Sequence, residues 1–129
     1  MIALDIGLKR IGIAQNRLGI AIPLNPIIRK NRNQAANELN KIIQTINPKI
    51  IIIGIPKDGN AEEEMTRRIK HFVSLLDISS NIKIVYVDES FSTFEAEERI
   101  KEIKKNRKNG TIDSIAASII LERYLMSQK

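Results

Sequence analysis

The stretch Ile50-Ile51-Ile52-Ile53-Gly54-Ile55-Pro56 is an unbroken apolar run near the middle of the chain. A strand with one exposed face alternates apolar and polar residues, whereas an uninterrupted run is typical of a strand buried on both faces. Such strands occur in parallel sheets that helices cover on both sides. We therefore expect this segment to be a central strand of an α/β protein.

The segments on either side of this run form a βαβ pattern. Residues 31–46 carry apolar side chains at helical spacing, and Asn47-Pro48 ends that helix. A second helix follows the run, with an apolar stripe made of Met65, Ile69, Phe72, Val73 and Leu76. It leads to a further strand at Lys83–Val87. Helical crossovers of this kind join parallel strands.

Three β-rich segments precede these elements, at Met1–Asp5, Arg10–Gln15 and Gly19–Ile28, and tight turns join them. Two helices follow, one after a capping-box pattern at Ser92–Glu95 and a last one with Asp113 in its first turn. We expect an antiparallel three-strand meander extended by two parallel strands. This five-stranded mixed sheet with flanking helices is the layout of ribonuclease H-like folds, and we expect residues 1–129 to form a single α/β domain.

Composition narrows the chemistry. The 129 residues include 21 Lys and Arg against 15 Asp and Glu, a net charge of +6, which favours a polyanionic partner. The absence of cysteine excludes disulfides, thiolate zinc sites and iron–sulfur clusters, and the single His71 excludes a multi-histidine site. No apolar stretch reaches the roughly 18 residues of a membrane span. Because an acid stands at position 5, where a signal peptide needs basic residues, we expect a cytoplasmic protein without membrane attachment.

Four acidic residues are candidates for catalysis: Asp5 within an apolar strand, Asp88 and Glu89 at the end of another, and Asp113 at the start of the last helix. Taken singly, each has a structural alternative, in a turn or at a helix N-terminus. The predicted sheet, however, brings them to one edge, where uncompensated carboxylates would repel one another. Mg²⁺ or Mn²⁺ relieves such repulsion. Two such ions about 4 Å apart can stabilise both the attacking and the leaving oxygen when a phosphodiester bond is cleaved.

Four blocks of sequence resemble a known family. They are Asp5-Ile6-Gly7-Leu8-Lys9-Arg10-Ile11-Gly12; Gly54-Ile55-Pro56 with Gly59; Asp88-Glu89-Ser90-Phe91-Ser92-Thr93; and Asp113-Ser114-Ile115-Ala116-Ala117 with Leu121 and Tyr124-Leu125. In this order they resemble the YqgF family, whose members are described as pre-16S rRNA nucleases and, by fold similarity to RuvC, as Holliday junction resolvases. The resemblance covers essentially the whole chain. It implies a ribonuclease H-like fold and metal-dependent phosphodiester hydrolysis at Asp5, Glu89 and Asp113.

The chain departs from the family pattern at three positions. Leu8 and Ser92 stand where the family usually has Thr, and Ser90 stands where it usually has Arg, which puts a phosphate contact near the site in question. The middle acid also has two candidates, because Asp88 and Glu89 are adjacent and point to opposite sides of an extended strand. We favour Glu89 as the metal ligand, with Asp88 as the second candidate.

Basic residues near the acids are candidates for binding nucleic acid. Residues 99–108 hold six bases and one acid, whereas residues 88–98 hold five acids and no base. A solvated helix face would explain the basic segment; alternatively, it holds a backbone phosphate beside the metals. The candidates are Lys9, Arg10, Thr93, Lys104, Lys105, Arg107 and Lys108. Since aromatic residues make up only 4% of the chain, we expect recognition of backbone and shape rather than of bases.

Several functions remain open on the sequence alone. The first is processing of the 5′ end of pre-16S rRNA during ribosome biogenesis, by a monomer or weak homodimer. The second is resolution of four-way DNA, which needs a dimer to make paired cuts. A non-catalytic nucleic-acid-binding module is the third. The pattern Asp-x-Gly-x-x-x-x-Gly also opens sugar kinases and actin-like ATPases, but those bind ATP between two large lobes and 129 residues supply one.

Overall fold

The computed structural model describes residues 1–56, 60–88 and 114–128. The elements are β1 (Ile2–Ile6), β2 (Arg10–Arg17), β3 (Ile20–Ile28), α1 (Arg32–Ile46), β4 (Ile50–Ile55), α2 (Asn60–Ser74), β5 (Lys83–Asp88) and α4 (Ile115–Ser127). Every predicted strand is present in the predicted order. The helix predicted after Ser92 and the position of Asp113 lie outside the described residues.

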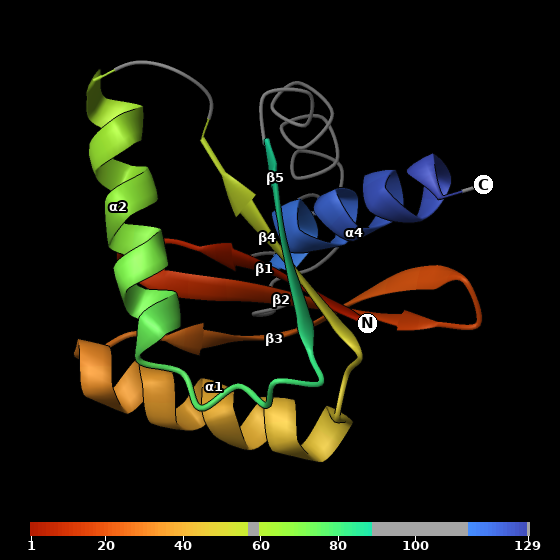
Figure 1. The fold of residues 1–129 in the computed structure, drawn as a ribbon, viewed down its shortest axis with the longest axis horizontal. Coiled ribbons are helices and arrows are strands. Elements are labelled where there is room, and N and C mark those ends of the chain that lie inside the picture. Colours follow the sequence, from red (N-terminus) through yellow and green to blue (C-terminus); the bar gives the residue numbers. More distant parts are fainter. Residues whose placement is uncertain (57–59, 89–113, 129) are drawn as a thin grey trace, which may run out of the picture.

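The strands form one sheet in the order β3-β2-β1-β4-β5 (Figure 1). β1 pairs antiparallel with β2, and β2 pairs antiparallel with β3, which gives the predicted meander. On the other side, β1 pairs parallel with β4 and β4 pairs parallel with β5. The predicted five-stranded mixed sheet is therefore confirmed. In this arrangement β1, β4 and β5 all end at the same edge of the sheet.

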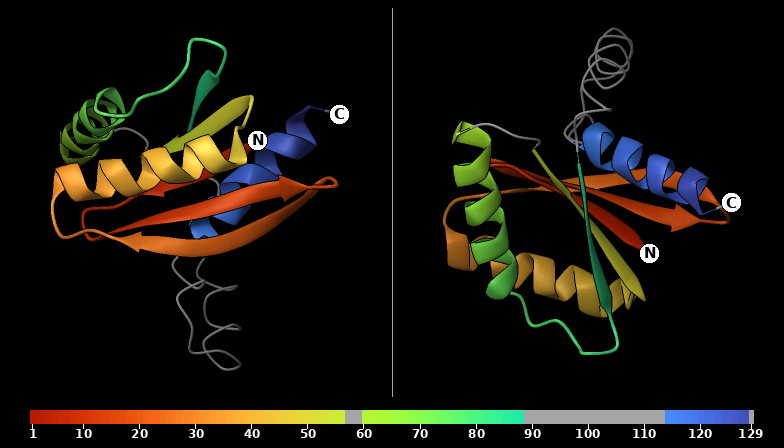
Figure 2. Two further views of the ribbon diagram at one scale, coloured as in Figure 1. Left: turned by 90° about the horizontal axis from the view of Figure 1, so that it is seen from below. Right: turned by 45° about the horizontal axis from the view of Figure 1, so that its top comes forward.

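Helices cover the sheet on both faces, as the apolar run in β4 requires. Ile51, Ile52 and Ile53 are fully buried in consecutive positions, so their side chains enter two different cores. Ile51 and Ile53 pack with residues of α1 and α2, whereas Ile52 packs with residues of α4. Figure 2 shows α1 and α2 on one side of the sheet and α4 on the other. None of the helices in the described part of the chain is long and apolar enough to cross a membrane.

Local sequence sets the limits of α1. The Asn31 side chain accepts a hydrogen bond from the backbone N–H of Gln34, whose own side chain accepts one from the backbone of Asn31, so the two form a capping box. Asn47 ends the helix in the left-handed conformation, with φ of 51°. The predicted helix over residues 31–46 is confirmed, except that Asn31 serves as its cap rather than as its first turn.

Candidate active site

A tight turn between β1 and β2 fixes the position of Asp5. The backbone N–H of Gly7 donates to the carbonyl oxygen of Arg10 at 2.9 Å, which closes the turn. A Cβ on residue 7 would lie 2.8 Å from that oxygen, so glycine is needed for this close approach. Asp5 lies two residues before Gly7, near the end of β1, opposite Gly12 of β2. Its side chain is half-buried, as expected for an acid near the end of an apolar strand.

Strand alternation assigns Asp5 to the face that α4 covers. Ala3 packs into the core formed with α4, whereas Leu4 packs into the core formed with α1 and α2. Because side chains two residues apart share a face, Asp5 lies on the same side as Ala3. Of the helices that the structure describes, α4 is thus the one on the same face of the sheet as this carboxylate.

The same argument assigns Asp88 to the opposite face. In β5, Ile84 packs against the core of α1 and α2, and the amine of Lys70 on α2 lies 5.3 Å from the ring centre of Tyr86. Asp88 follows Tyr86 by two positions and is exposed. The sheet therefore brings Asp5 and Asp88 to one edge but not to one face.

A buried hydrogen bond anchors the start of α4 beside Asp5. Ser114 has no exposed surface, and its hydroxyl accepts a hydrogen bond from the backbone N–H of Ile13 at 3.0 Å. Ile13 directly follows Gly12, the partner of Asp5 in β2. It lies where the pairing of β2 with β3 shifts register, and the serine satisfies a backbone donor at that irregularity.

The remaining predicted residues divide into two groups. Lys9 and Arg10 are exposed in and after the β1–β2 turn, at the same edge as Asp5. The others lie outside the described residues: Glu89, Thr93, Lys104, Lys105, Arg107, Lys108 and Asp113. Within the ranges that the structure describes, no group of three or more acids and histidines could hold a metal ion. Of the predicted catalytic acids, Asp5 is therefore the one that the described part of the chain places on the α4 face at this edge.

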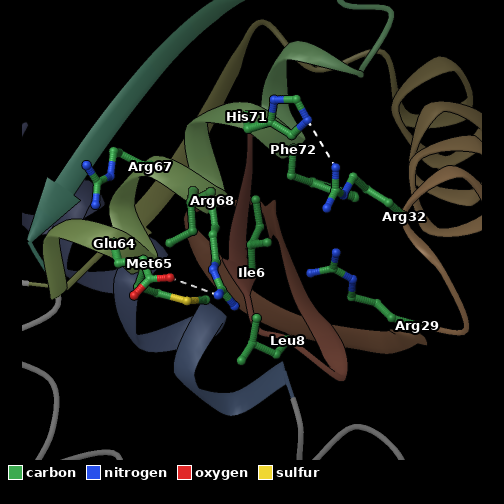
Figure 3. A pocket seen from close by; sticks show the side chains of 11 residues that line it. Ile6, Leu8, Arg29, Arg32, Glu64, Met65, Arg67, Arg68, His71 and Phe72 are labelled. Carbon is green, nitrogen blue, oxygen red and sulfur yellow. Dashed lines mark hydrogen bonds and ion pairs between the residues drawn. The ribbon is translucent and has the colours of Figure 1, made fainter. Parts of the chain in front are cut away.

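Sequence reasoning missed a second feature of this edge. Arg29, Arg32, Arg67 and Arg68 line a pocket on the face of α1 and α2 (Figure 3). The sequence signals were the arginine pair 67–68 and the bases that precede the first helix. Because these segments are far apart in the chain, spacing alone did not show that they meet.

Similarity to known proteins identifies the family of this chain. The family described as "RuvX: Holliday junction resolvase" matches residues 1–127. This chain belongs to the RuvX family. Its relatives include a protein of Sulfurovum sp. (strain NBC37-1) named "Putative pre-16S rRNA nuclease", which is 50% identical over 124 residues, or 95% of each chain. A Helicobacter hepaticus protein of the same name is 43% identical over 135 residues, covering 100% of this chain and 96% of its own.

Solved structures extend the likeness at the level of the fold. A structure titled "T. thermophilus RuvC in complex with Holliday junction substrate" aligns with a TM-score of 0.65 and 10% identity, covering 99% of this chain and 95% of that one. A Fowlpox virus resolvase bound to Holliday junction DNA aligns with a TM-score of 0.60 and 18% identity, covering 99% of both chains. The RuvX-family chain therefore has the predicted ribonuclease H-like fold, and the predicted family resemblance is confirmed.

Proposed function

We propose that this RuvX-family chain is a nuclease that hydrolyses phosphodiester bonds in the precursor of 16S ribosomal RNA, at its 5′ end. The observation that carries the proposal is the identity of 50% over 95% of both chains with a relative that bears the pre-16S rRNA nuclease name. The half-buried Asp5, at the edge where three parallel strands end, supplies a chemical centre for that activity. Strand ends of open α/β sheets are the usual place for such centres.

The catalytic acids in this proposal are Asp5, Glu89 and Asp113. Two features of the described residues support the set. Asp88 belongs to the face opposite Asp5, so strand alternation favours Glu89 as the acid from this strand. Asp113 is covalently joined to Ser114, whose hydroxyl accepts a hydrogen bond from the backbone of Ile13. Ile13 follows Gly12, which pairs with Asp5.

An all-carboxylate donor set suits Mg²⁺ or Mn²⁺, and we propose that Asp5, Glu89 and Asp113 hold two such ions. This fit rests on the donor chemistry, because carboxylate oxygens are the ligands that these hard cations prefer. When bound, the ions supply Lewis acidity that favours ionisation of water and stabilises charge on phosphoryl oxygens. Asp5 enters the site from a strand, which restricts the movement of its carboxylate.

Basic residues at the same edge complete the proposed site. Lys9 and Arg10 project from the turn that follows β1, where they can bind backbone phosphates close to Asp5. The proposal adds Thr93, Lys104, Lys105, Arg107 and Lys108 as further contacts to the nucleic acid. Phosphate contacts position a strand without reading its bases, which suits a structured RNA substrate. We place the protein in the cytoplasm, as a monomer or weak homodimer.

Four-way DNA is the second candidate substrate, because the matching family is described as a Holliday junction resolvase. The test incubates the protein with Mn²⁺ and either a labelled pre-16S rRNA fragment or a labelled four-way junction. We expect cleavage of the RNA near the mature 5′ end and an intact junction. Paired symmetric cuts in the junction, with the RNA intact, would overturn the proposal in favour of resolution. Binding without cleavage of either substrate would indicate a non-catalytic module.

A further inference from the structure

A basic pocket lies at the same edge of the sheet as Asp5 but on the opposite face. It has a volume of about 550 Å³ and is formed by the end of β1, the β1–β2 turn, the link from β3 to α1, and α2. Figure 3 shows Arg29 extending from that link, Arg32 from the first turn of α1 and Arg68 from α2 toward the same space. Ile6 and Leu8 line the side nearest the sheet. Since Ile6 directly follows Asp5, one strand of nucleic acid crossing this edge can contact both faces.

Positive charge in the pocket is only partly compensated. Among the described residues that line it, Glu64 is the one acid, and it forms an ion pair with Arg68 at 2.9 Å. Arg32 donates a hydrogen bond to the Nε2 atom of His71 at 3.2 Å, and a histidine ring brings no negative charge to offset the guanidinium. Among the residues that the structure describes, neither Arg29 nor Arg32 forms an ion pair with a carboxylate.

Arg29 is held rigidly at the centre of this arrangement. Its Nη1 atom donates to the carbonyl oxygen of Gly7 at 2.6 Å, and its guanidinium lies 4.8 Å from the ring centre of Phe72. Burial, and secondly the charge of Arg32, lower the pKa of Arg29 below its ordinary value. The two guanidinium groups therefore repel each other. An anion between them would remove that repulsion and use donors that the described contacts leave available.

The shape and chemistry of the pocket fit a nucleotide. Guanidinium groups match the geometry of phosphate oxygens and bind them in pairs. Next to the arginines, Leu8 is 61% exposed and can contact a sugar or base. The volume also lies within the range of ordinary small-ligand pockets, about 300–1,000 Å³. A narrower space would admit an isolated ion but not a nucleotide.

We propose that this pocket binds a phosphate group of the nucleic-acid substrate, on the far side of the sheet edge from the cleavage site. The inference rests on the proposed function for the identity of the ligand, and it adds Arg32 and Arg68 as binding residues. A neighbouring hollow, lined by Leu8, Arg29, Lys30, Asn31, Arg32 and Asn33, continues the basic surface toward the start of α1. The nucleic-acid strand thus has a basic path that leads away from the cleavage site.

The test measures binding of a fluorescent pre-16S rRNA fragment without divalent ions, so that cleavage does not interfere. Arg32→Ala combined with Arg68→Ala should weaken binding by about tenfold or more, since each arginine gives a charge-assisted hydrogen bond. The slope of log affinity against log salt should fall by about 0.7–0.9 for each lost phosphate contact. Arg29 is left unchanged because it also supports the turn at Gly7.

Arg17→Ala combined with Lys49→Ala is the matched control, because both side chains are exposed, at the end of β2 and just before β4, and the pair removes two positive charges as the arginine variant does. It should leave affinity within about twofold. Equal losses in the control and the double arginine variant, or wild-type binding by the double arginine variant, would overturn the inference. An effect confined to RNA with a 5′-phosphate would assign a terminal phosphate to the pocket, whereas an equal effect on 5′-hydroxyl RNA would assign an internal one.

Failure of this inference and failure of the proposed function are distinguishable. If the wild type binds RNA through the pocket but cuts no RNA after Mn²⁺ is added, the phosphate pocket stands and the nuclease proposal falls. If the wild type cuts the RNA, and the double arginine variant has the same RNA affinity and cleavage rate, the nuclease proposal stands and the assignment of phosphate binding to the pocket is wrong.

Discussion

Gly7 allows the backbone of the β1–β2 turn to approach itself closely. Its replacement by Ala places a methyl group 2.8 Å from the carbonyl oxygen of Arg10, so the turn must open. We expect Gly7→Ala to lower the free energy of unfolding by about 1–3 kcal/mol, as is usual for overpacking. Urea denaturation followed by circular dichroism measures this loss. An unchanged midpoint would show that the turn relaxes without cost.

Ser114 is the second residue whose role can be tested alone. Its replacement by Ala leaves the N–H of Ile13 without its buried acceptor, which should cost about 1–3 kcal/mol. Ser118 is a matched control, because it is also buried on α4 but bonds to the carbonyl oxygen of Ile115 in its own helix. Ser118→Ala should therefore cost less. Equal unfolding midpoints for the two variants would contradict the anchoring role of Ser114.

At the scale of elements, the alternation of β5 assigns Asp88 to one face of the sheet. Asp88 belongs to the face of α1 and α2, whereas Asp5 belongs to the face of α4. We expect Asp88→Asn to keep most of the cleavage activity and Glu89→Gln to lose it, because only one of the two positions can face Asp5. Rates on the pre-16S rRNA fragment under identical Mn²⁺ concentrations measure the difference. Loss of activity in Asp88→Asn alone would reverse the assignment.

The elements themselves were largely predictable from the sequence. The apolar run ending at Ile55 predicted a strand buried on both faces, and the structure buries Ile51 to Ile53 completely. Residues 31–46 predicted α1, because their apolar side chains recur at helical spacing and Asn47-Pro48 ends the helix where that spacing stops. These signals are local, so one sequence is enough to recognise them.

The arrangement of faces and pockets was harder to predict. Period-two alternation shows that neighbours differ in face, but it does not show which core receives Ile84 and which receives Val85. The contact between Arg32 and His71 joins residues 39 positions apart, and the bond between Ile13 and Ser114 joins residues 101 positions apart. Such pairs depend on how helices pack on the sheet, which local periodicity does not specify.

In the whole molecule, we propose that the two faces of one sheet edge have different tasks. The face of α4 carries Asp5 and the proposed chemistry, while the face of α1 and α2 carries the arginine pocket. Both tasks suit a chain with a net charge of +6 and a polyanionic substrate. Binding and cleavage should consequently respond to different substitutions. The double arginine variant should weaken binding, whereas changes at Asp5 should act on the cleavage step.

The most direct test is single-turnover cleavage of the pre-16S rRNA fragment, in Mn²⁺, by the wild type and by Asp5→Asn. This substitution keeps the size of the side chain and removes its negative charge, so the fold should remain intact. We predict that the rate falls by roughly a thousandfold or more while RNA affinity stays within about twofold, as expected when a metal-holding acid is lost. Cleavage by Asp5→Asn at the wild-type rate would contradict the assignment of the active site to this edge.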